Sequence, residues 1–137
     1  LRACVPYLKQ GFDPSVVIMA SKNVPAPGPG AAAYSVAKAG LTQFARVASM
    51  ELGEHGIRIN ILHPNAVYDT GIWDDDMLKT RASMYGKTVD EYKKSNILKQ
   101  EVSSSDVARA AALFAGVDLN MTTGSQIPVD GGNERVI

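Results

Sequence analysis

The sequence predicts an α/β fold in which helices flank a parallel β-sheet of three strands. Segments typical of strands and of helices alternate along the 137 residues, and this order favours parallel strands joined by helical connections. Residues 16–21 form a continuous apolar run, which is typical of a strand buried on both faces of a sheet. The length fits one domain with its own core, and the sequence contains no internal repeat.

The first eleven residues have the pattern of the last turns of an amphipathic helix that ends at Gly11. No methionine and no capping residue precede this pattern. We therefore expect the chain to be the C-terminal piece of a longer protein.

The next elements are a strand over residues 16–21 and a loop, residues 22–30, that is rich in proline and glycine. Residues 31–54 predict a long helix because good helix formers dominate the segment, and Gly56 lies near its end. A second strand over residues 57–64 follows this helix.

The segment 69–100 is polar and irregular, and we expect two short helices that are joined near Gly86. The three adjacent aspartates at 74–76 cannot converge on one metal ion from a single helix face. They favour the first turn of a helix, where the helix dipole stabilises negative charge.

The last two elements are a helix over residues 103–116 and a short strand over residues 125–132. Ser104 or Ser105 is the expected N-cap of this helix, and Gly116 is its expected end.

Composition excludes several classes of function. The net charge is zero and no basic run is present, so binding to nucleic acid or to an anionic membrane has little electrostatic support. The apolar runs are too short to span a bilayer. A single cysteine fits a reducing, cytoplasmic location, and two histidines with one cysteine predict no metal site.

Tyr34 and Lys38 stand four residues apart on the predicted helix, so they share one face. An ammonium group close to a phenol lowers the pKa of the phenol, which lets a tyrosine exchange a proton with a substrate oxygen. The pair alone is also compatible with a solvated polar face. Ser21 follows the first strand, where ligands of parallel sheets bind, although a turn serine is an equal alternative.

Several features together resemble the C-terminal half of a short-chain dehydrogenase/reductase: Ser21, the Tyr34-x-x-x-Lys38 spacing, IRINILHP at 57–64 and TTGSQIPVDGG at 122–132. The resemblance covers essentially the whole chain. It implies the C-terminal part of a Rossmann-like doubly wound parallel sheet, with the N-terminal half of the domain absent.

The resemblance also implies NAD or NADP as cofactor and an oxidoreductase activity on CH–OH groups. Tyr34 would be the general acid and base, Lys38 would bind the nicotinamide ribose and favour the tyrosinate, and Ser21 would hydrogen-bond the substrate oxygen. The residues expected to contact the nicotinamide, in addition to Tyr34 and Lys38, are Pro64, Asn65, Ala66, Val67 and Thr70. No metal is implied.

The sequence departs from the family pattern in three ways. Asn65 replaces the usual glycine after Pro64, and asparagine tolerates the left-handed backbone that such a turn uses. Thr70 lies one residue later than the pattern places its hydroxyl. The third departure is that this sequence does not contain the glycine-rich phosphate loop, its strand or the acidic ribose residue, which belong to the family's N-terminal half.

A narrower resemblance is carried by ASKNVPAPGPGAAAYS, HPNAVYDTGIW and the ending DGGNERVI. These segments are similar to the dehydrogenase domain of bifunctional rhamnulose-phosphate aldolase/alcohol dehydrogenases, in which an aldolase domain comes first. The implied substrate is lactaldehyde or a related short hydroxyaldehyde or alcohol. The alternatives are a sugar-phosphate or polyol dehydrogenase of the same family, and an inactive fragment that serves only in assembly, as a homo-oligomer.

Other residues have two open interpretations. His63 ends the second strand, and a structural role is favoured over contact with a ligand. Lys22 and Asn23 follow Ser21 and border the expected substrate site. Four apolar residues of the expected substrate lid either contact the substrate or pack the lid onto the body: Trp73, Met77, Met84 and Tyr85.

Overall fold

The computed structural model describes residues 1–132 and contains the predicted three-stranded parallel sheet, with strands in the order β1-β2-β3. Its elements in chain order are α1 (Val5–Leu8), β1 (Ser15–Met19), α2 (Ala32–Leu52), the 3-10 helix η1 (Gly53–His55), β2 (Arg58–Pro64), α3 (Asp75–Met84), α4 (Val89–Lys93), α5 (Ser104–Ala115), the 3-10 helix η2 (Val117–Leu119) and β3 (Gln126–Val129). The ending DGGNERVI lies outside the described residues from position 133 onward.

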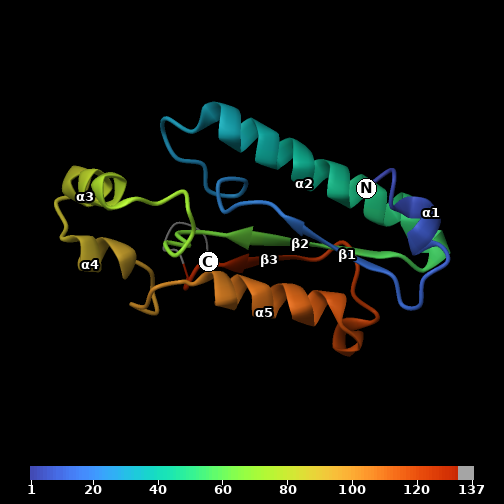
Figure 1. Ribbon diagram of the computed structural model, residues 1–137. Helices are drawn as coiled ribbons and strands as arrows, with labels where there is room; N and C mark the ends of the chain where they lie inside the picture. The colour runs from blue at the N-terminus through green and yellow to red at the C-terminus, as the bar shows by residue number, and fades with distance from the viewer. Residues whose placement is uncertain (133–137) are drawn as a thin grey trace.

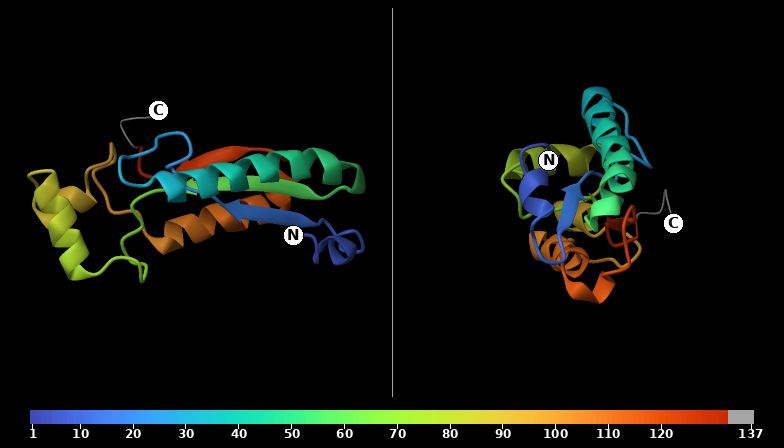
Figure 2. Two further views of the ribbon diagram at one scale, coloured as in Figure 1. Left: turned by 90° about the horizontal axis from the view of Figure 1, so that it is seen from above. Right: turned by 90° about the vertical axis from the view of Figure 1, so that its right-hand side faces the viewer.

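Helices cover both faces of the sheet, with α2 on one face and α5 on the other (Figures 1 and 2). β2 runs through the centre and is buried at every position but the last. On the α2 face, Ile59 and Ile61 form a core with Ala45 and Ala48. On the α5 face, the Arg58 guanidinium donates to the Phe114 carbonyl at the end of α5 at 2.8 Å. The predicted doubly wound arrangement is therefore confirmed.

β1 lies at one edge of the sheet and pairs only with β2 among the described residues. The Ala20 N–H donates to the Leu62 carbonyl at 2.8 Å, so Ala20 faces β2. Because successive residues of a strand direct their backbone groups to opposite sides, Met19 directs its N–H and carbonyl to the other, unpaired side. This edge bears unpaired backbone groups on a largely apolar strand, and such an edge is a template for pairing.

Several element boundaries differ from the prediction; β3, for example, ends at Val129, three residues before the predicted end at 132. β1 ends at Met19, so Ser21 lies two residues beyond the strand rather than inside it. The N-cap of α5 is Ser103, not Ser104 or Ser105. Among the three consecutive serines only Ser103 has a carboxylate at the third helical position, Asp106, and the two residues form a reciprocal capping box.

α3 and α4 project beyond the carboxyl ends of the strands (Figure 1). Gly86 lies between them, as predicted, with a φ of 63°. The Asp74 carboxylate caps α3 by accepting the Met77 N–H at 2.7 Å, which confirms the helix-start interpretation of the aspartate run. Within residues 1–132 no helix combines the length and apolar character needed to cross a membrane.

Candidate active site

Tyr34 and Lys38 share one face of α2, as their spacing predicts. The Lys38 ammonium lies 5.8 Å from the centre of the Tyr34 ring, and the ring is 49% exposed. Lys38 Nζ also donates to the Met19 carbonyl at the end of β1, at 2.9 Å. This bond anchors the lysine at the carboxyl end of the sheet, so an accessible phenol, an ammonium group and a strand end meet at one place.

Ser21 is buried two residues after Met19, and its Oγ accepts the Asn23 N–H at 3.1 Å. The Ser21 carbonyl contacts His63 Nδ1 at 2.8 Å, and His63 Nε2 contacts Gln126 Oε1 at 2.9 Å. His63 is buried and bridges the ends of β1 and β3, which agrees with its predicted structural role. Ser21 thus has separate partners from Tyr34, and the Met19–Lys38 hydrogen bond is the link between the two segments.

The segment 64–70 leaves β2 at the same edge of the sheet. Its backbone strain falls on Ala66, which has a φ of 55°, whereas the sequence favoured Asn65 for the left-handed position. Asn65 instead donates its N–H to the Val129 carbonyl at 3.2 Å, a bond that continues the β2–β3 ladder. The Thr70 hydroxyl donates to the Val67 carbonyl at 3.0 Å and closes the segment into a turn.

Asp69 was not identified from the sequence. Its carboxylate accepts the Ser104 backbone N–H at 2.8 and 3.0 Å and the Ser104 hydroxyl at 2.8 Å. The hydrogen bonds from the Ser104 side chain and then its backbone lower the pKa of Asp69, while the charge of Asp106 opposes this effect. The sequence contained a signal for this contact. Asp69 lies in the segment that follows β2, and the serine run that begins α5 lies at the same edge of the sheet.

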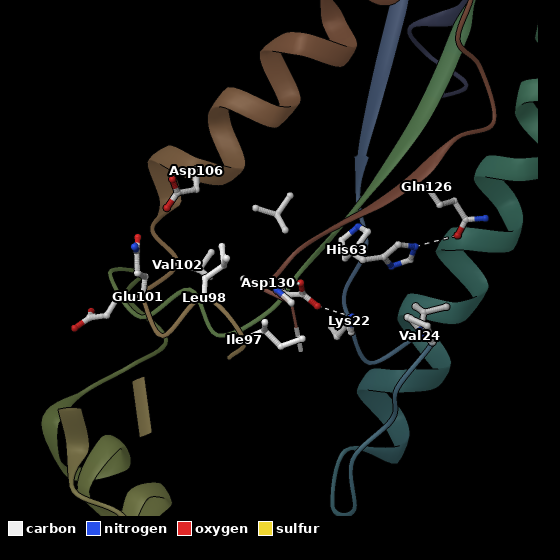
Figure 3. Close-up of a pocket in the computed structure, with 16 residues that line it drawn as sticks. Lys22, Val24, His63, Ile97, Leu98, Glu101, Val102, Asp106, Gln126 and Asp130 are labelled. Carbon is white, nitrogen blue, oxygen red and sulfur yellow. Dashed lines mark hydrogen bonds and ion pairs between the residues drawn. The ribbon is translucent and has the colours of Figure 1, made fainter. Parts of the chain in front are cut away.

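A cavity of about 860 Å³ lies at the carboxyl ends of the strands (Figure 3). Its polar wall includes an ion pair between Lys22 and Asp130, whose side chains are each 3% exposed. Ile97 and Leu98 contribute apolar side chains to the lining. Ser21, Tyr34 and Lys38 do not line this cavity, which therefore adjoins Ser21 only through its neighbour Lys22 and its partner His63.

The aromatic residues of the expected lid pack on one another. The buried Tyr68 ring contacts Trp73 edge-on with centroids 4.9 Å apart and contacts Tyr92 at 5.8 Å, while Tyr85 stacks on Tyr92 at 5.7 Å. Burial, and next the proximity of Tyr92, raises the pKa of Tyr68 well above its ordinary value. Burial also raises the pKa of Tyr92. Both phenols stay protonated at neutral pH, and their contacts make them packing residues of the lid.

Known proteins match most of this chain. A family model described as "Enoyl-(Acyl carrier protein) reductase" matches residues 1–134. The chain is 40% identical over 123 residues to an uncharacterized oxidoreductase, YuxG, of Bacillus subtilis, with 86% of this chain and 18% of that protein covered. It is 31% identical over 134 residues to a mitochondrial (-)-isopiperitenol/(-)-carveol dehydrogenase of Mentha piperita, with 96% and 48% covered.

Solved structures give the same result. A carveol dehydrogenase from Mycobacterium avium, solved in complex with NAD, superposes with a TM-score of 0.84 at 27% identity and covers 98% of this chain and 51% of that one. The chain thus spans about half, or less, of the length of the relatives it matches. The match over nearly all residues, together with the parallel sheet and the Tyr34–Lys38 pair at its carboxyl end, shows that the chain belongs to the short-chain dehydrogenase/reductase family.

Proposed function

We propose that this chain is the catalytic and substrate part of an NAD- or NADP-dependent alcohol dehydrogenase. The observation that carries the proposal is the Lys38 ammonium at 5.8 Å from the accessible Tyr34 ring, beside the carboxyl end of β1. The exposed Tyr34 hydroxyl can exchange a proton with the oxygen of an alcohol bound at this edge of the sheet, and Lys38 lies beside both the ring and the strand end.

In the oxidation direction, the substrate hydroxyl transfers its proton to the Tyr34 oxygen as the carbinol C–H bond breaks. The bound nicotinamide supplies the hydride acceptor for this step. Ser21 donates its hydroxyl hydrogen to the substrate oxygen, and the Oγ is already oriented by the Asn23 N–H that it accepts. In the reduction direction, Tyr34 returns the proton to the carbonyl oxygen.

The side chains present suit the nicotinamide end of the cofactor. An ammonium group has three N–H donors, and Lys38 uses one toward Met19, so others can reach the ribose hydroxyls. The Thr70 hydroxyl gives its hydrogen to Val67, which leaves its oxygen as an acceptor for the N–H groups of a carboxamide. Pro64, Asn65, Ala66 and Val67 would form the rest of this contact. The NAD complex of the Mycobacterium avium relative supports NAD or NADP as the kind of cofactor.

For the substrate we propose a short hydroxyaldehyde or alcohol such as lactaldehyde, and for the whole protein an aldolase domain ahead of this one. The support is the three sequence segments quoted above and the B. subtilis relative, of which this chain covers only 18%. A sugar phosphate is less well supported. The cation next to Ser21 is Lys22, and it is already buried in an ion pair with Asp130. Association into a homo-oligomer is part of the proposal, because the β1 edge is available for pairing.

The test is Tyr34→Phe in the intact protein, compared with Tyr7→Phe at an exposed tyrosine outside the site. We expect kcat of Tyr34→Phe to fall about a hundredfold to ten-thousandfold, the range for loss of a proton-transfer group, while the cofactor Kd is unchanged. Tyr7→Phe should match the wild type. Near-normal turnover by Tyr34→Phe would contradict the proposed role. If the wild type binds neither NAD⁺ nor NADP⁺ in calorimetric titrations, the assembly-only alternative is favoured.

A further inference from the structure

We propose that Asp69 positions the nicotinamide loop, defined as residues 64–70. It positions the loop by tethering it to Ser104 at the start of α5. The inference rests on the proposed function, because it takes the loop to be the part of the chain that contacts the nicotinamide. It adds a residue that lies outside the expected set of cofactor contacts.

The tether is made by one carboxylate and one residue of a distant segment. Both Asp69 oxygens lie within 3.0 Å of the Ser104 backbone nitrogen, and Oδ2 also accepts the Ser104 hydroxyl at 2.8 Å. A carboxylate that accepts a backbone N–H at a helix start forms a charge-assisted hydrogen bond, which is stronger than a neutral one. Removal of the Asp69 side chain therefore leaves two donors of Ser104 without this partner.

The same two segments are also joined by a second contact, between their backbones. Val67, two residues before Asp69, forms an isolated parallel bridge with Val102, two residues before Ser104. The two short segments thus run side by side and meet twice. Thr70 follows Asp69 directly, and its hydroxyl bonds back to the Val67 carbonyl. Thr70, the expected carboxamide contact, therefore lies directly after one point of attachment and is bonded back to the other.

The helix does not need Asp69 for its own capping. Ser103 and Asp106 already form a complete capping box at the start of α5. The hydrogen bonds from Ser104 lower the pKa of Asp69, so the Asp69 carboxylate is favoured where it is. Because α5 already has a complete cap, the main effect of the Asp69–Ser104 contact is to attach the loop.

The backbone of the loop is strained at one residue, and contacts around the loop are needed to keep it in that conformation. Ala66 has a φ of 55°, a left-handed conformation that an L-residue other than glycine or asparagine rarely adopts. Strained backbone persists where surrounding contacts determine it. The tether on one side and the buried Tyr68 ring against Trp73 and Tyr92 on the other fix the residues that follow Ala66.

The test compares Asp69→Ala, Asp69→Asn and Ser104→Ala in the intact protein with Asp118→Ala, an exposed aspartate at the opposite end of α5. Calorimetric titration gives the Kd for the cofactor that the wild type binds, and steady-state kinetics give KM and kcat. We expect Asp69→Ala to raise the cofactor Kd and KM about tenfold with a smaller change in kcat, because a tenfold loss of affinity is about the effect of losing one hydrogen bond to a charged group. Asp69→Asn and Ser104→Ala should have intermediate Kd values, since each keeps part of the tether.

The double variant Asp69→Ala/Ser104→Ala should bind cofactor no worse than Asp69→Ala, because both changes remove the same contact. Asp118→Ala should match the wild type. An unchanged cofactor Kd in both Asp69→Asn and Ser104→Ala would overturn the inference and leave the proposed function standing. These two variants decide the test even if Asp69→Ala does not fold. A lower melting temperature with wild-type Kd would show a structural role only and would overturn it too. Absence of cofactor binding by the wild type would overturn the proposed function and this inference together.

Discussion

Removal of one partner from the buried ion pair between Lys22 and Asp130 is expected to destabilise the protein strongly. In Lys22→Met, the Asp130 carboxylate would stay where only 3% of its side chain is exposed, with its cationic partner removed. Breaking a buried pair on one side costs about 3–5 kcal/mol of unfolding free energy. With a urea dependence of about 2 kcal/mol per molar, the unfolding midpoint of the intact protein should fall by about 2 M.

Two further variants separate this effect from loss of charge in general. Lys22→Met combined with Asp130→Leu should recover most of the lost stability, because neither charge of this pair then remains buried without the other. Lys79→Met is the matched control. Its pair with Asp76 spans 3.9 Å between side chains that are 70% and 97% exposed, so the change should cost less than about 1 kcal/mol. A loss below about 1 kcal/mol in Lys22→Met, or a double variant as unstable as the single one, would refute the reasoning.

Three other predictions concern the site and its supports. Lys38→Met should raise the cofactor KM, because the ammonium group that is proposed to bind the ribose is lost; an unchanged cofactor KM would remove this role. Ala66→Gly should stabilise the protein by about 0.5–1 kcal/mol in urea unfolding, since glycine adopts a φ of 55° without strain; a destabilised variant would contradict this account. Hydrogen bonds from the Ser103 side chain and backbone lower the pKa of Asp106 in the folded state. Its contribution to stability is therefore complete above the ordinary aspartate value of about 3.9 and is lost as the pH falls through the lower folded value. Asp106→Asn should flatten the dependence of the unfolding free energy on pH below about 4, and a variant with the wild-type slope would show that another group controls it.

The parts of the fold that could be predicted from the sequence are those that local pattern determines. The apolar run of β1 and the composition of α2 identified both elements, and the four-residue spacing placed Tyr34 and Lys38 on one face. The choice of N-cap failed because three consecutive serines are locally equivalent until the partner Asp106 is considered. The left-handed position fell on Ala66 because Asn65 was already committed to the β2–β3 ladder.

The pairs that join distant segments could not be predicted in this way. Asp69 and Ser104 are 35 residues apart, and Lys22 and Asp130 are still farther apart in the chain. No periodicity relates such positions, and only the order of the parallel strands brings them to the same edge of the sheet. Each of these residues follows a strand or begins a helix at that edge, so a search that covered both the strand ends and the helix starts would have included them.

The hydrogen bond from Lys38 to Met19 has a consequence for how the sheet and the proposed catalytic group depend on each other. The Met19 carbonyl belongs to the unpaired side of β1, and it is the acceptor that holds the lysine ammonium. A strand that added to this edge in register would offer its own N–H to the same carbonyl. Lys38 would then compete with the added strand for the Met19 carbonyl, and its ammonium group would be able to donate to another acceptor near the Tyr34 ring. Pairing at the β1 edge and the position of the Lys38 ammonium are therefore coupled through the Met19 carbonyl.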